Sequence, residues 1–468
     1  MNETKKNGAG RDRPRRPQGA TAGRKPEDMQ PFKPGLALRI AATKLLTAVV
    51  ERKTSLDGML DAEHGNPSYT QLSEADRALV RAILNSALRH LPRIEAMISA
   101  LLDTPLPEGA RSLHHLLVVA AAQMLYLDIP DHSAVDLAVE QANRDPRSRR
   151  FSKVVNAILR RVGRERADLL EWAEQVNCVP EWFDNRLAHV YGREQADAIA
   201  AALLTPAAID LTVKSDAEGW ATRLNGVRLP TGGVRLRDFK GSVSALEGYD
   251  EGQWWVQDAA AAIPALLFQD IAGKSVADLC AAPGGKTAQL ILRGARVTAV
   301  EQSASRLARL QTNLARLGLE AECIHANLRD FRPTSLFDAI LLDAPCSSTG
   351  TTRRHPDVLW TKGPDDVAKL ARVQHDLLSH AVTLLAPGGQ LVFSNCSLDP
   401  SEGEEVVAAV LAANPDLRRI PIAAETLPGL ESAITPLGEV RTTPAMLEGG
   451  DGVSGGLDGF YACLLHKI

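Results

Sequence analysis

The chain has 468 residues, too many for a single domain, and roughly three domains are expected at this length. Hydrophobic residues make up 45% of the sequence and the formal net charge is −4, which favours a globular protein and excludes a uniformly basic nucleic-acid coat. The six cysteines form no Cys-x-x-Cys pair or His/Cys cluster, and no apolar run could span a bilayer. We therefore expect a cytoplasmic protein without disulfides, a metal site or a membrane partner.

The N-terminal third of the chain divides into a tail and a helical region. Residues 1–34 are polar and rich in Gly, Pro, Arg and Lys, which predicts a disordered basic tail. From 35 to 165, apolar residues recur at helical spacing and predict an all-helical domain. Within it, Ser73 followed by Asp76 resembles a capping box that opens one of the helices.

The end of the helical region is a concentrated positive patch in a chain of negative net charge. Only Asp145 and Glu165 offset its basic residues, which are Arg144, Arg147, Arg149, Arg150, Lys153, Arg160, Arg161, Arg164 and Arg166. We interpret the patch as a surface for RNA phosphates. The alternative is an exposed helix face whose charges contact only solvent.

The remainder of the chain predicts a small linker followed by an α/β domain. Residues 166–245 combine helical pieces with a strand at 209–213 and predict a small mixed linker domain. From 246 to 468, short apolar strands alternate with helices, which predicts a doubly wound, Rossmann-like domain. Because ligands bind at the carboxyl ends of such strands, the residues found there mark one site. These residues are Asp278, Glu301, Asn327, Asp343 and Cys396.

A glycine turn after the first of these strands indicates what the site binds. The turn, DLCAAPGGKT at 278–287, lies between an apolar strand and a helix, and an isolated Gly-Gly pair is often only a structural turn. A phosphate-binding loop would need glycine at Cys280, and the Gly-x-Gly-x-x-Gly of dinucleotide sites is absent. S-adenosylmethionine needs no phosphate cradle, and Glu301 could bind its ribose hydroxyls, so we expect this cofactor.

Two thiols, Cys346 and Cys396, follow neighbouring predicted strands. A lone cysteine is usually an inert buried residue, but two beside a methyl donor suggest methylation of a pyrimidine. Carbon 5 of cytosine becomes nucleophilic only when a thiolate adds to carbon 6, and that thiolate must later be expelled, so two tasks arise. Asp343 could bind ring nitrogen 3 and offset the charge that builds there. Spacing does not decide which cysteine performs which task.

Four motifs resemble those of the RNA (cytosine-5) methyltransferases: DLCAAPGGKT at 278–287, LLDAPCSSTG at 341–350, RRHPD at 353–357 and NCSL at 395–398. The third is similar to the signature of the bacterial ribosomal RNA small-subunit methyltransferase B branch, also called Sun or Fmu. That branch carries an N-terminal domain similar to the antitermination factor NusB, which residues 35–165 fit. The resemblance implies a multidomain protein with an all-α NusB-like RNA-binding domain and an α/β Rossmann-like methyltransferase domain at 246–468.

The resemblance implies a role for each residue of the site. Glu301 holds the ribose of the cofactor, Asn327 its adenine, and Asp343 lies near both cofactor and cytosine. Cys396 is the attacking nucleophile, and Cys346 assists product release. The turn that wraps the methionine part of the cofactor consists of Cys280, Ala281, Ala282, Pro283, Gly284, Gly285 and Lys286.

The resemblance also implies that Arg353, Arg354 and His355 approach the RNA backbone, whereas the alternative is a polar loop. In the helical domain the RNA-binding candidates are Arg149, Arg150, Lys153, Arg160 and Arg161. Two positions depart from the family pattern. Asn327 stands where Asp usually accepts from the adenine amino group, so binding should persist but weaken. Asn395 stands where Thr is common, and we expect little consequence.

The sequence therefore predicts a monomeric enzyme that uses S-adenosylmethionine to methylate carbon 5 of a cytosine in small-subunit (16S) ribosomal RNA through a covalent cysteine–cytosine intermediate. Two alternatives remain. The substrate could be tRNA or another RNA, because the catalytic motifs do not distinguish them. The chain could also be a catalytically inactive RNA-binding factor, although the presence of both Cys346 and Cys396 argues against this.

Overall fold

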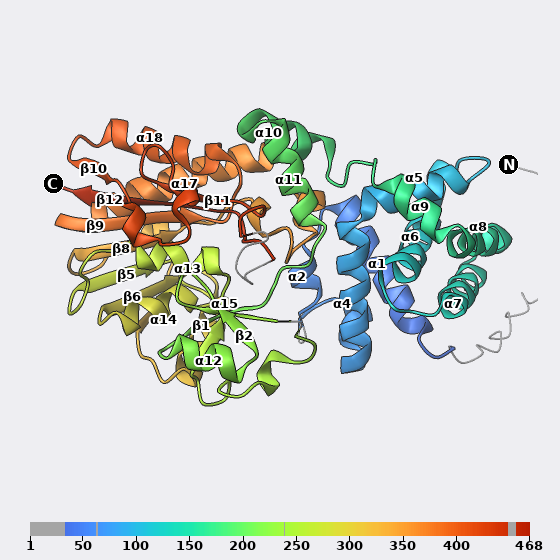
Figure 1. The fold of residues 1–468 in the computed structure, drawn as a ribbon, viewed down its shortest axis with the longest axis horizontal. Coiled ribbons are helices and arrows are strands. Elements are labelled where there is room, and N and C mark those ends of the chain that lie inside the picture. Colours follow the sequence, from blue (N-terminus) through green and yellow to red (C-terminus); the bar gives the residue numbers. More distant parts are fainter. Residues whose placement is uncertain (1–32, 62–63, 238, 448–454) are drawn as a thin grey trace, which may run out of the picture.

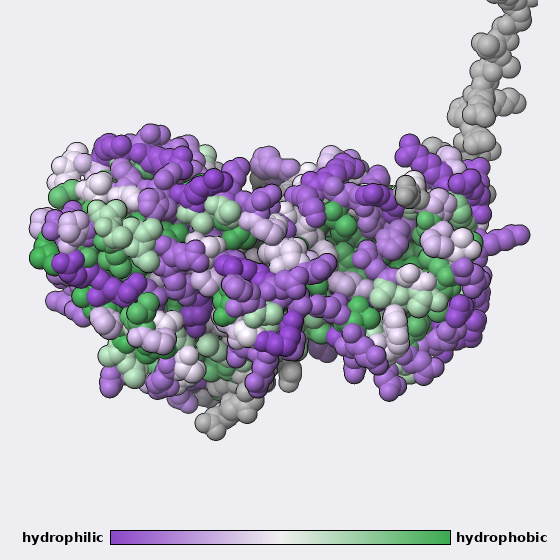
Figure 2. All heavy atoms as spheres, turned by 90° about the horizontal axis from the view of Figure 1, so that it is seen from above, coloured by the Kyte–Doolittle hydropathy of each residue, from purple (hydrophilic) through white to green (hydrophobic). Residues whose placement is uncertain are grey.

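The computed structural model describes residues 33–61, 64–237, 239–447 and 455–468. The chain forms an elongated molecule with a helical lobe at one end and an α/β lobe at the other (Figure 1). Hydrophilic residues cover much of the face that is seen from above (Figure 2). The predicted tail, 1–34, lies almost entirely outside the described residues. No helix among those described is both long and apolar enough to cross a membrane.

The helical lobe is a bundle in which each helix contributes an apolar face to one core. Its helices are α1 (Leu36–Arg52), α2 (Leu56–Met59), α3 (Pro67–Thr70), α4 (Glu74–Arg89), α5 (Leu91–Leu101), α6 (Arg111–Tyr126), α7 (Asp131–Arg144), α8 (Ser152–Arg164) and α9 (Arg166–Ala173). Of the predicted capping box of α4, the structure shows the N-cap bond, in which Ser73 Oγ accepts from the Asp76 N–H at 3.2 Å. Leu169 and Ala173 of α9 join the same core, so the lobe extends beyond the predicted boundary at 165.

The predicted linker domain, 166–245, is not one unit. The helices α10 (Glu181–Tyr191) and α11 (Arg193–Leu203) pack against each other and against Leu359 and Leu398 of the α/β lobe. A separate antiparallel sheet in the order β2-β3-β1-β4 follows, with the helix α12 (Ala217–Arg223) beside it. Its strands are β1 (Asp210–Val213), β2 (Gly226–Arg228), β3 (Val234–Leu236) and β4 (Trp254–Val256). Because β4 completes this sheet, the predicted boundary at 245 cuts through it.

The α/β lobe is built on an eight-stranded sheet with the order β10-β12-β9-β8-β5-β6-β7, and β11 pairs with β12. The strands are β5 (Ser275–Leu279), β6 (Arg296–Glu301), β7 (Glu322–His325), β8 (Phe337–Asp343), β9 (Leu385–Asn395), β10 (Leu417–Ile420), β11 (Val440–Thr442) and β12 (Phe460–Lys467). The strands β5 to β9 run parallel to their neighbours, whereas β12 runs antiparallel to β9. The chain order reverses at β5, which lies between β6 and β8, and such a switch point is where doubly wound sheets bind ligands.

Helices cover both faces of this sheet, as the alternation of its side chains requires (Figure 1). Val276 and Leu341 belong to the core on the face covered by α13 (Ala259–Leu266) and α14 (Gly285–Leu292). Ala277 and Ile340 belong to the opposite core, which α17 (Pro364–Leu384) and α18 (Glu404–Ala413) cover. The predicted Rossmann-like architecture is confirmed, and the helix α15 (Ala304–Arg316) joins the first of these faces through Leu310.

The loop that follows β8 also joins the two lobes. It contains α16 (Val358–Thr361), where the Trp360 indole donates to the Leu88 carbonyl at 3.0 Å and the Trp360 carbonyl accepts from Lys53 at 2.6 Å. The Asp357 carboxylate accepts from the Leu56 N–H at 2.9 Å. The helical lobe is thus bonded directly to the loop after β8, which also carries Cys346.

Candidate active site

The two thiols meet beyond the carboxyl ends of adjacent parallel strands. Asp343 at the end of β8 pairs in register with Ser394 near the end of β9, and the chain then carries Cys346 and Cys396 toward each other. Their sulfur atoms lie 3.4 Å apart, within hydrogen-bonding distance for sulfur, and both residues are partly buried. The structure therefore brings together two thiols that are 50 residues apart in the sequence.

The surroundings distinguish the two sulfur atoms. A hydrogen bond from Cys346 lowers the pKa of the Cys396 thiol, and the Lys286 ammonium group adds to this effect. The pKa of Cys346 is raised by its contact with Cys396, by burial and by the nearby Glu402 carboxylate. These surroundings favour the thiolate at Cys396 over that at Cys346, and the thiolate is the nucleophilic form.

A lysine–aspartate pair lies beside the thiols. Lys286 Nζ donates to Asp343 Oδ2 at 2.8 Å and lies 4.9 Å from the centre of the Phe460 ring. The other carboxylate oxygen of Asp343 accepts from the Ser394 hydroxyl at 2.9 Å. Both oxygens of Asp343 are thus oriented by bonds to neighbouring elements, which holds the side chain in place at the switch point of the sheet.

The glycine turn lines a cavity of about 550 Å³ that also reaches Asp343 and Cys396. Gly284 has φ of 104°, a conformation that side chains other than glycine rarely adopt. A Cβ atom at Gly285 would lie 3.1 Å from Trp255 Nε1, so a larger residue there would crowd the wall of the cavity. Because glycines occupy these positions, a ligand in the cavity can lie close to the backbone of the turn.

Two buried carboxylates at the strand ends each have an oxygen without a hydrogen-bond partner among the described residues. Glu301 is 2% exposed; its Oε1 accepts from the Ser303 N–H at 2.9 Å, while Oε2 accepts none and lies 3.8 Å from the Arg306 guanidinium. Asp278 Oδ2 accepts from Thr287 at 2.6 Å, while Oδ1 has no partner, and burial raises the pKa of Asp278 to about 7. Unpaired buried oxygens are costly, so they favour a ligand with hydroxyl or amino donors.

Asn327 follows β7 and is exposed. Its side-chain oxygen accepts from the Arg329 N–H at 3.1 Å, which caps the turn after the strand. Asn327 also lines a cavity of about 250 Å³ together with Cys280 and Pro345. Because Cys280 lines the 550 Å³ cavity as well, the two spaces adjoin along the glycine turn.

A third cavity, of about 600 Å³, lies between the lobes and reaches both thiols. It is lined on one side by Ser55 and Asp57 of the helical lobe and on the other by the α/β lobe. Cys396 lines this cavity and the 550 Å³ cavity, so it stands at their boundary. The basic residues of its wall are Arg306, Arg309 and Lys362.

The RRHPD motif was predicted to approach RNA, and this prediction is wrong for Arg353. Its side chain is 2% exposed and donates to the Gly455 carbonyl, so it is part of the interior. Arg354 bonds two carboxylates, those of Asp258 and Asp458, at 2.5 and 2.9 Å. His355 does line the cavity between the lobes, where its Nδ1 lies 3.3 Å from Asp57 and this contact raises the pKa of His355.

The predicted basic patch extends from the end of α7 through η2 (Arg149–Phe151) and α8 to the start of α9, at the end of the helical lobe far from the sheet (Figure 1). Arg149, Arg150, Lys153 and Arg160 are exposed, whereas Arg161 is paired with Glu165 at 3.1 Å. The patch is therefore separate from the cavities around the thiols.

Sequence reasoning missed the residues that hold the Cys396 loop. From α10, Arg186 forms two bonds to Asp399, at 2.7 and 2.6 Å, and the Tyr191 hydroxyl donates to the Leu398 carbonyl at 2.7 Å. Glu402, in the acidic run after NCSL, is fully buried beneath both thiol loops. That acidic run was a visible signal, but nothing in it indicated which carboxylate would be buried.

Comparisons with known proteins agree with this architecture. A family model described as 16S rRNA methyltransferase RsmB/F matches residues 265–463, and one described as NusB family matches 37–164. The ribosomal RNA small subunit methyltransferase B of Sodalis glossinidius is 35% identical over 85% of this chain and 94% of its own. Its counterpart in Klebsiella pneumoniae subsp. pneumoniae is 34% identical over 93% of this chain and 100% of its own. The crystal structure of PH0851 shares the fold, with a TM-score of 0.69 at 20% identity over 93% of this chain and 99% of that one.

Proposed function

The chain belongs to the ribosomal RNA small subunit methyltransferase B family, and from this membership and the geometry of the site we propose that it transfers a methyl group from S-adenosylmethionine to carbon 5 of a cytosine in small-subunit ribosomal RNA. The predicted NusB-like and methyltransferase domains are confirmed by the two family matches. One observation carries the finer proposal: two thiols lie 3.4 Å apart, and Cys396 lines both the cavity beside the glycine turn and the cavity between the lobes, which Cys346 lines as well.

The residues of the sheet edge fit S-adenosylmethionine. The buried Glu301 Oε2, which accepts no hydrogen bond within the described part of the chain, suits a ribose hydroxyl, and the turn from Cys280 to Lys286 leaves room for the methionine part. Asn327 and the smaller cavity beside it suit the adenine. When bound there, the cofactor would supply an electrophilic methyl group on its sulfonium centre. None of these residues offers a phosphate-binding loop, in agreement with this ligand.

The thiols would divide the covalent work. Cys396, whose pKa is lowered, adds to carbon 6 of the cytosine and makes carbon 5 electron-rich enough to accept the methyl group. As the carbon 6–sulfur bond breaks, the carbon 5 proton would pass to a base and Cys396 would leave as a thiolate, and Cys346 would assist this release by donating a hydrogen bond to the departing sulfur. Asp343, fixed by Lys286 and Ser394, would hold the pyrimidine edge by accepting from the amino group at carbon 4 and from nitrogen 3 once that atom is protonated in the adduct.

The RNA would approach through the cavity between the lobes. Arg306, Arg309 and Lys362 on its wall supply positive charge next to the thiols, and such charges bind phosphates without reading the sequence. Residues on the distant patch would hold a second part of the RNA, because they lie at the far end of the helical lobe. These residues are Arg149, Arg150, Lys153, Arg160 and Arg161.

Bisulfite sequencing of total RNA from cells with and without the gene tests the function. We expect one or a few cytosines of small-subunit ribosomal RNA to lose their protection when the gene is removed. A gene copy carrying Cys396→Ser should fail to restore protection, whereas the unaltered gene should restore it. Loss of protection only in tRNA would contradict the ribosomal substrate. Unchanged protection in every RNA would favour the inactive RNA-binding factor.

A substitution at Asn327 tests the adenine end of the proposed cofactor site. Asn327→Asp should lower the Kd for S-adenosylmethionine about fivefold, because a charged acceptor strengthens a hydrogen bond by about 1 kcal/mol. The carboxylate can still cap the turn by accepting from the Arg329 N–H, so folding should be unaffected. Isothermal titration of the two proteins checks this, and an unchanged Kd would show that residue 327 does not contact the adenine.

A further inference from the structure

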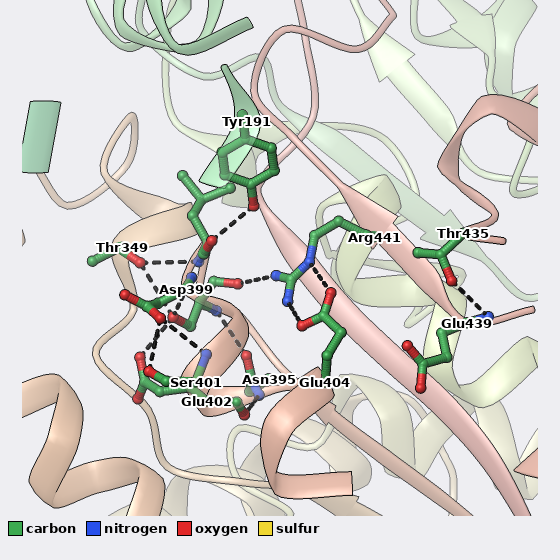
Figure 3. A network of polar contacts seen from close by, with 12 residues as sticks. Tyr191, Thr349, Asn395, Asp399, Ser401, Glu402, Glu404, Thr435, Glu439 and Arg441 are labelled. Carbon is green, nitrogen blue, oxygen red and sulfur yellow. Dashed lines mark hydrogen bonds and ion pairs between the residues drawn. The ribbon is translucent and has the colours of Figure 1, made fainter. Parts of the chain in front are cut away.

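Glu402 is a fully buried carboxylate at the end of η6 (Pro400–Glu402), between β9 and α18. Figure 3 shows it within a network of polar contacts that includes Thr349, Asn395 and Asp399. A buried charge is tolerated only when hydrogen-bond donors surround it. The identity of those donors shows which segments of the chain the carboxylate holds together.

The carboxylate of Glu402 accepts four hydrogen bonds from the described residues, and three of them come from the residues that directly follow the two thiols. Ser347, next to Cys346, donates its N–H to Oε1 at 2.8 Å and its hydroxyl to Oε2 at 2.5 Å. Ser397, next to Cys396, donates its hydroxyl to Oε2 at 2.6 Å. One carboxylate therefore joins the loop after β8 to the loop after β9.

The side chains of Gln374 and Asn395 extend the connection to the residues before each thiol. Gln374 Nε2 donates to Glu402 Oε1 at 2.9 Å and to the Pro345 carbonyl at 3.0 Å. Asn395 donates to the Glu402 carbonyl at 2.6 Å and accepts from the Ser397 N–H at 2.9 Å. The Asn395 side chain thus has structural hydrogen bonds, although its departure from the family pattern was expected to matter little.

This connection matters because the sheet does not hold the thiols. β8 ends at Asp343 and β9 ends at Asn395, so both sulfur atoms lie on loops. Their hydrogen bond requires the present separation of 3.4 Å, and catalytic groups need to be held to within about 0.5 Å. We propose that Glu402 is a positioning residue that keeps the two thiol loops in register, an inference that rests on the proposed two-thiol reaction.

The charge of Glu402 also acts on the thiols through space. Its negative field contributes to the raised pKa of Cys346, which keeps that thiol protonated. A protonated Cys346 can donate to Cys396 and favour the Cys396 thiolate. If the loops lose their register when Glu402 is replaced, the hydrogen bond between the thiols is weakened and the pKa of Cys396 should rise.

The test compares Glu402→Gln with Glu405→Gln, an exposed carboxylate three residues further along the chain. The first measurement is the rate at which iodoacetamide modifies Cys396 as a function of pH, followed by mass spectrometry of its peptide. We expect the midpoint for Glu402→Gln to lie at higher pH than for the unaltered protein, and that for Glu405→Gln to be unchanged. Unchanged profiles for both variants would overturn the proposal.

The second measurement is single-turnover methylation of a small-subunit ribosomal RNA transcript. Glu402→Gln should slow it roughly 10²-fold, as misplacement of a reacting group by about 1 Å can do, with cofactor affinity within twofold of normal. An unchanged rate would also overturn the proposal. Ser347→Ala removes a single neutral donor to Oε2. It should shift the pH midpoint and slow methylation in the same direction as Glu402→Gln, but less. If Glu402→Gln does not fold, Ser347→Ala replaces it in the test. If no RNA is methylated but the pH midpoint still moves, the positioning role stands and the proposed reaction fails.

Discussion

Replacement of Cys346 by alanine should leave the protein covalently attached to its RNA, whereas replacement of Cys396 by alanine should abolish both attachment and methylation. The first variant retains the nucleophile but lacks the group that assists its expulsion, so the intermediate accumulates. The second lacks the nucleophile, and its turnover should fall by at least about 10³-fold, a typical loss when a covalent nucleophile is removed. The 3.4 Å separation of the sulfur atoms allows both groups to act on one pyrimidine ring.

Denaturing gel electrophoresis with labelled RNA detects the attachment directly. Cys323→Ala is a suitable control, because Cys323 lies on β7 away from the paired thiols and is also only partly buried. An adduct with Cys396→Ala and none with Cys346→Ala would show that Cys346 is the nucleophile and that Cys396 assists release. Full turnover without an adduct by both variants would refute the covalent mechanism.

The sequence predicts the edge of the sheet well because that edge follows from local pattern. Apolar runs that end in Asp278, Glu301 and Asp343 are parallel strands, and the fold places their carboxyl ends side by side. The relative roles of the thiols did not follow from spacing. The proposed roles rest on the proximity of Cys346 to a buried carboxylate and of Lys286 to Cys396, and both contacts are tertiary.

Other features could not be predicted because their partners are distant along the chain. Arg353 is buried against Gly455, 102 residues away, and its carbonyl accepts from Arg89, 264 residues away. A motif of basic residues favours a surface role when only residue types are known. In the same way, β4 follows Gly252 and precedes an alanine-rich helix, but it pairs with β1, for example Val213 with Trp254, and so belongs to the smaller sheet.

Replacement of Glu301 should separate cofactor binding from stability. Glu301→Ala should raise the Kd for S-adenosylmethionine by roughly 10²-fold, because it removes a charged acceptor worth about 1.5–3 kcal/mol per hydrogen bond. Glu301→Gln should have a smaller effect, near tenfold, since the amide oxygen still accepts one bond. Isothermal titration measures both, and Glu322→Gln, an exposed carboxylate on the neighbouring strand β7, should leave the Kd unchanged.

The thermal stability of the cofactor-free protein gives the decisive comparison. Glu301 Oε2 is buried without a hydrogen-bond donor in the described part of the chain, and an incompletely paired buried charge destabilises the fold. Glu301→Gln neutralises that charge and keeps the acceptor for the Ser303 N–H, so its Tm without cofactor should equal or exceed that of the unaltered protein. A residue with a purely structural role would lose stability together with affinity. A lower Tm with an unchanged Kd would therefore show that Glu301 does not bind the ribose. Weaker binding without loss of stability would show that the carboxylate of Glu301 serves ligand binding and not the stability of the fold.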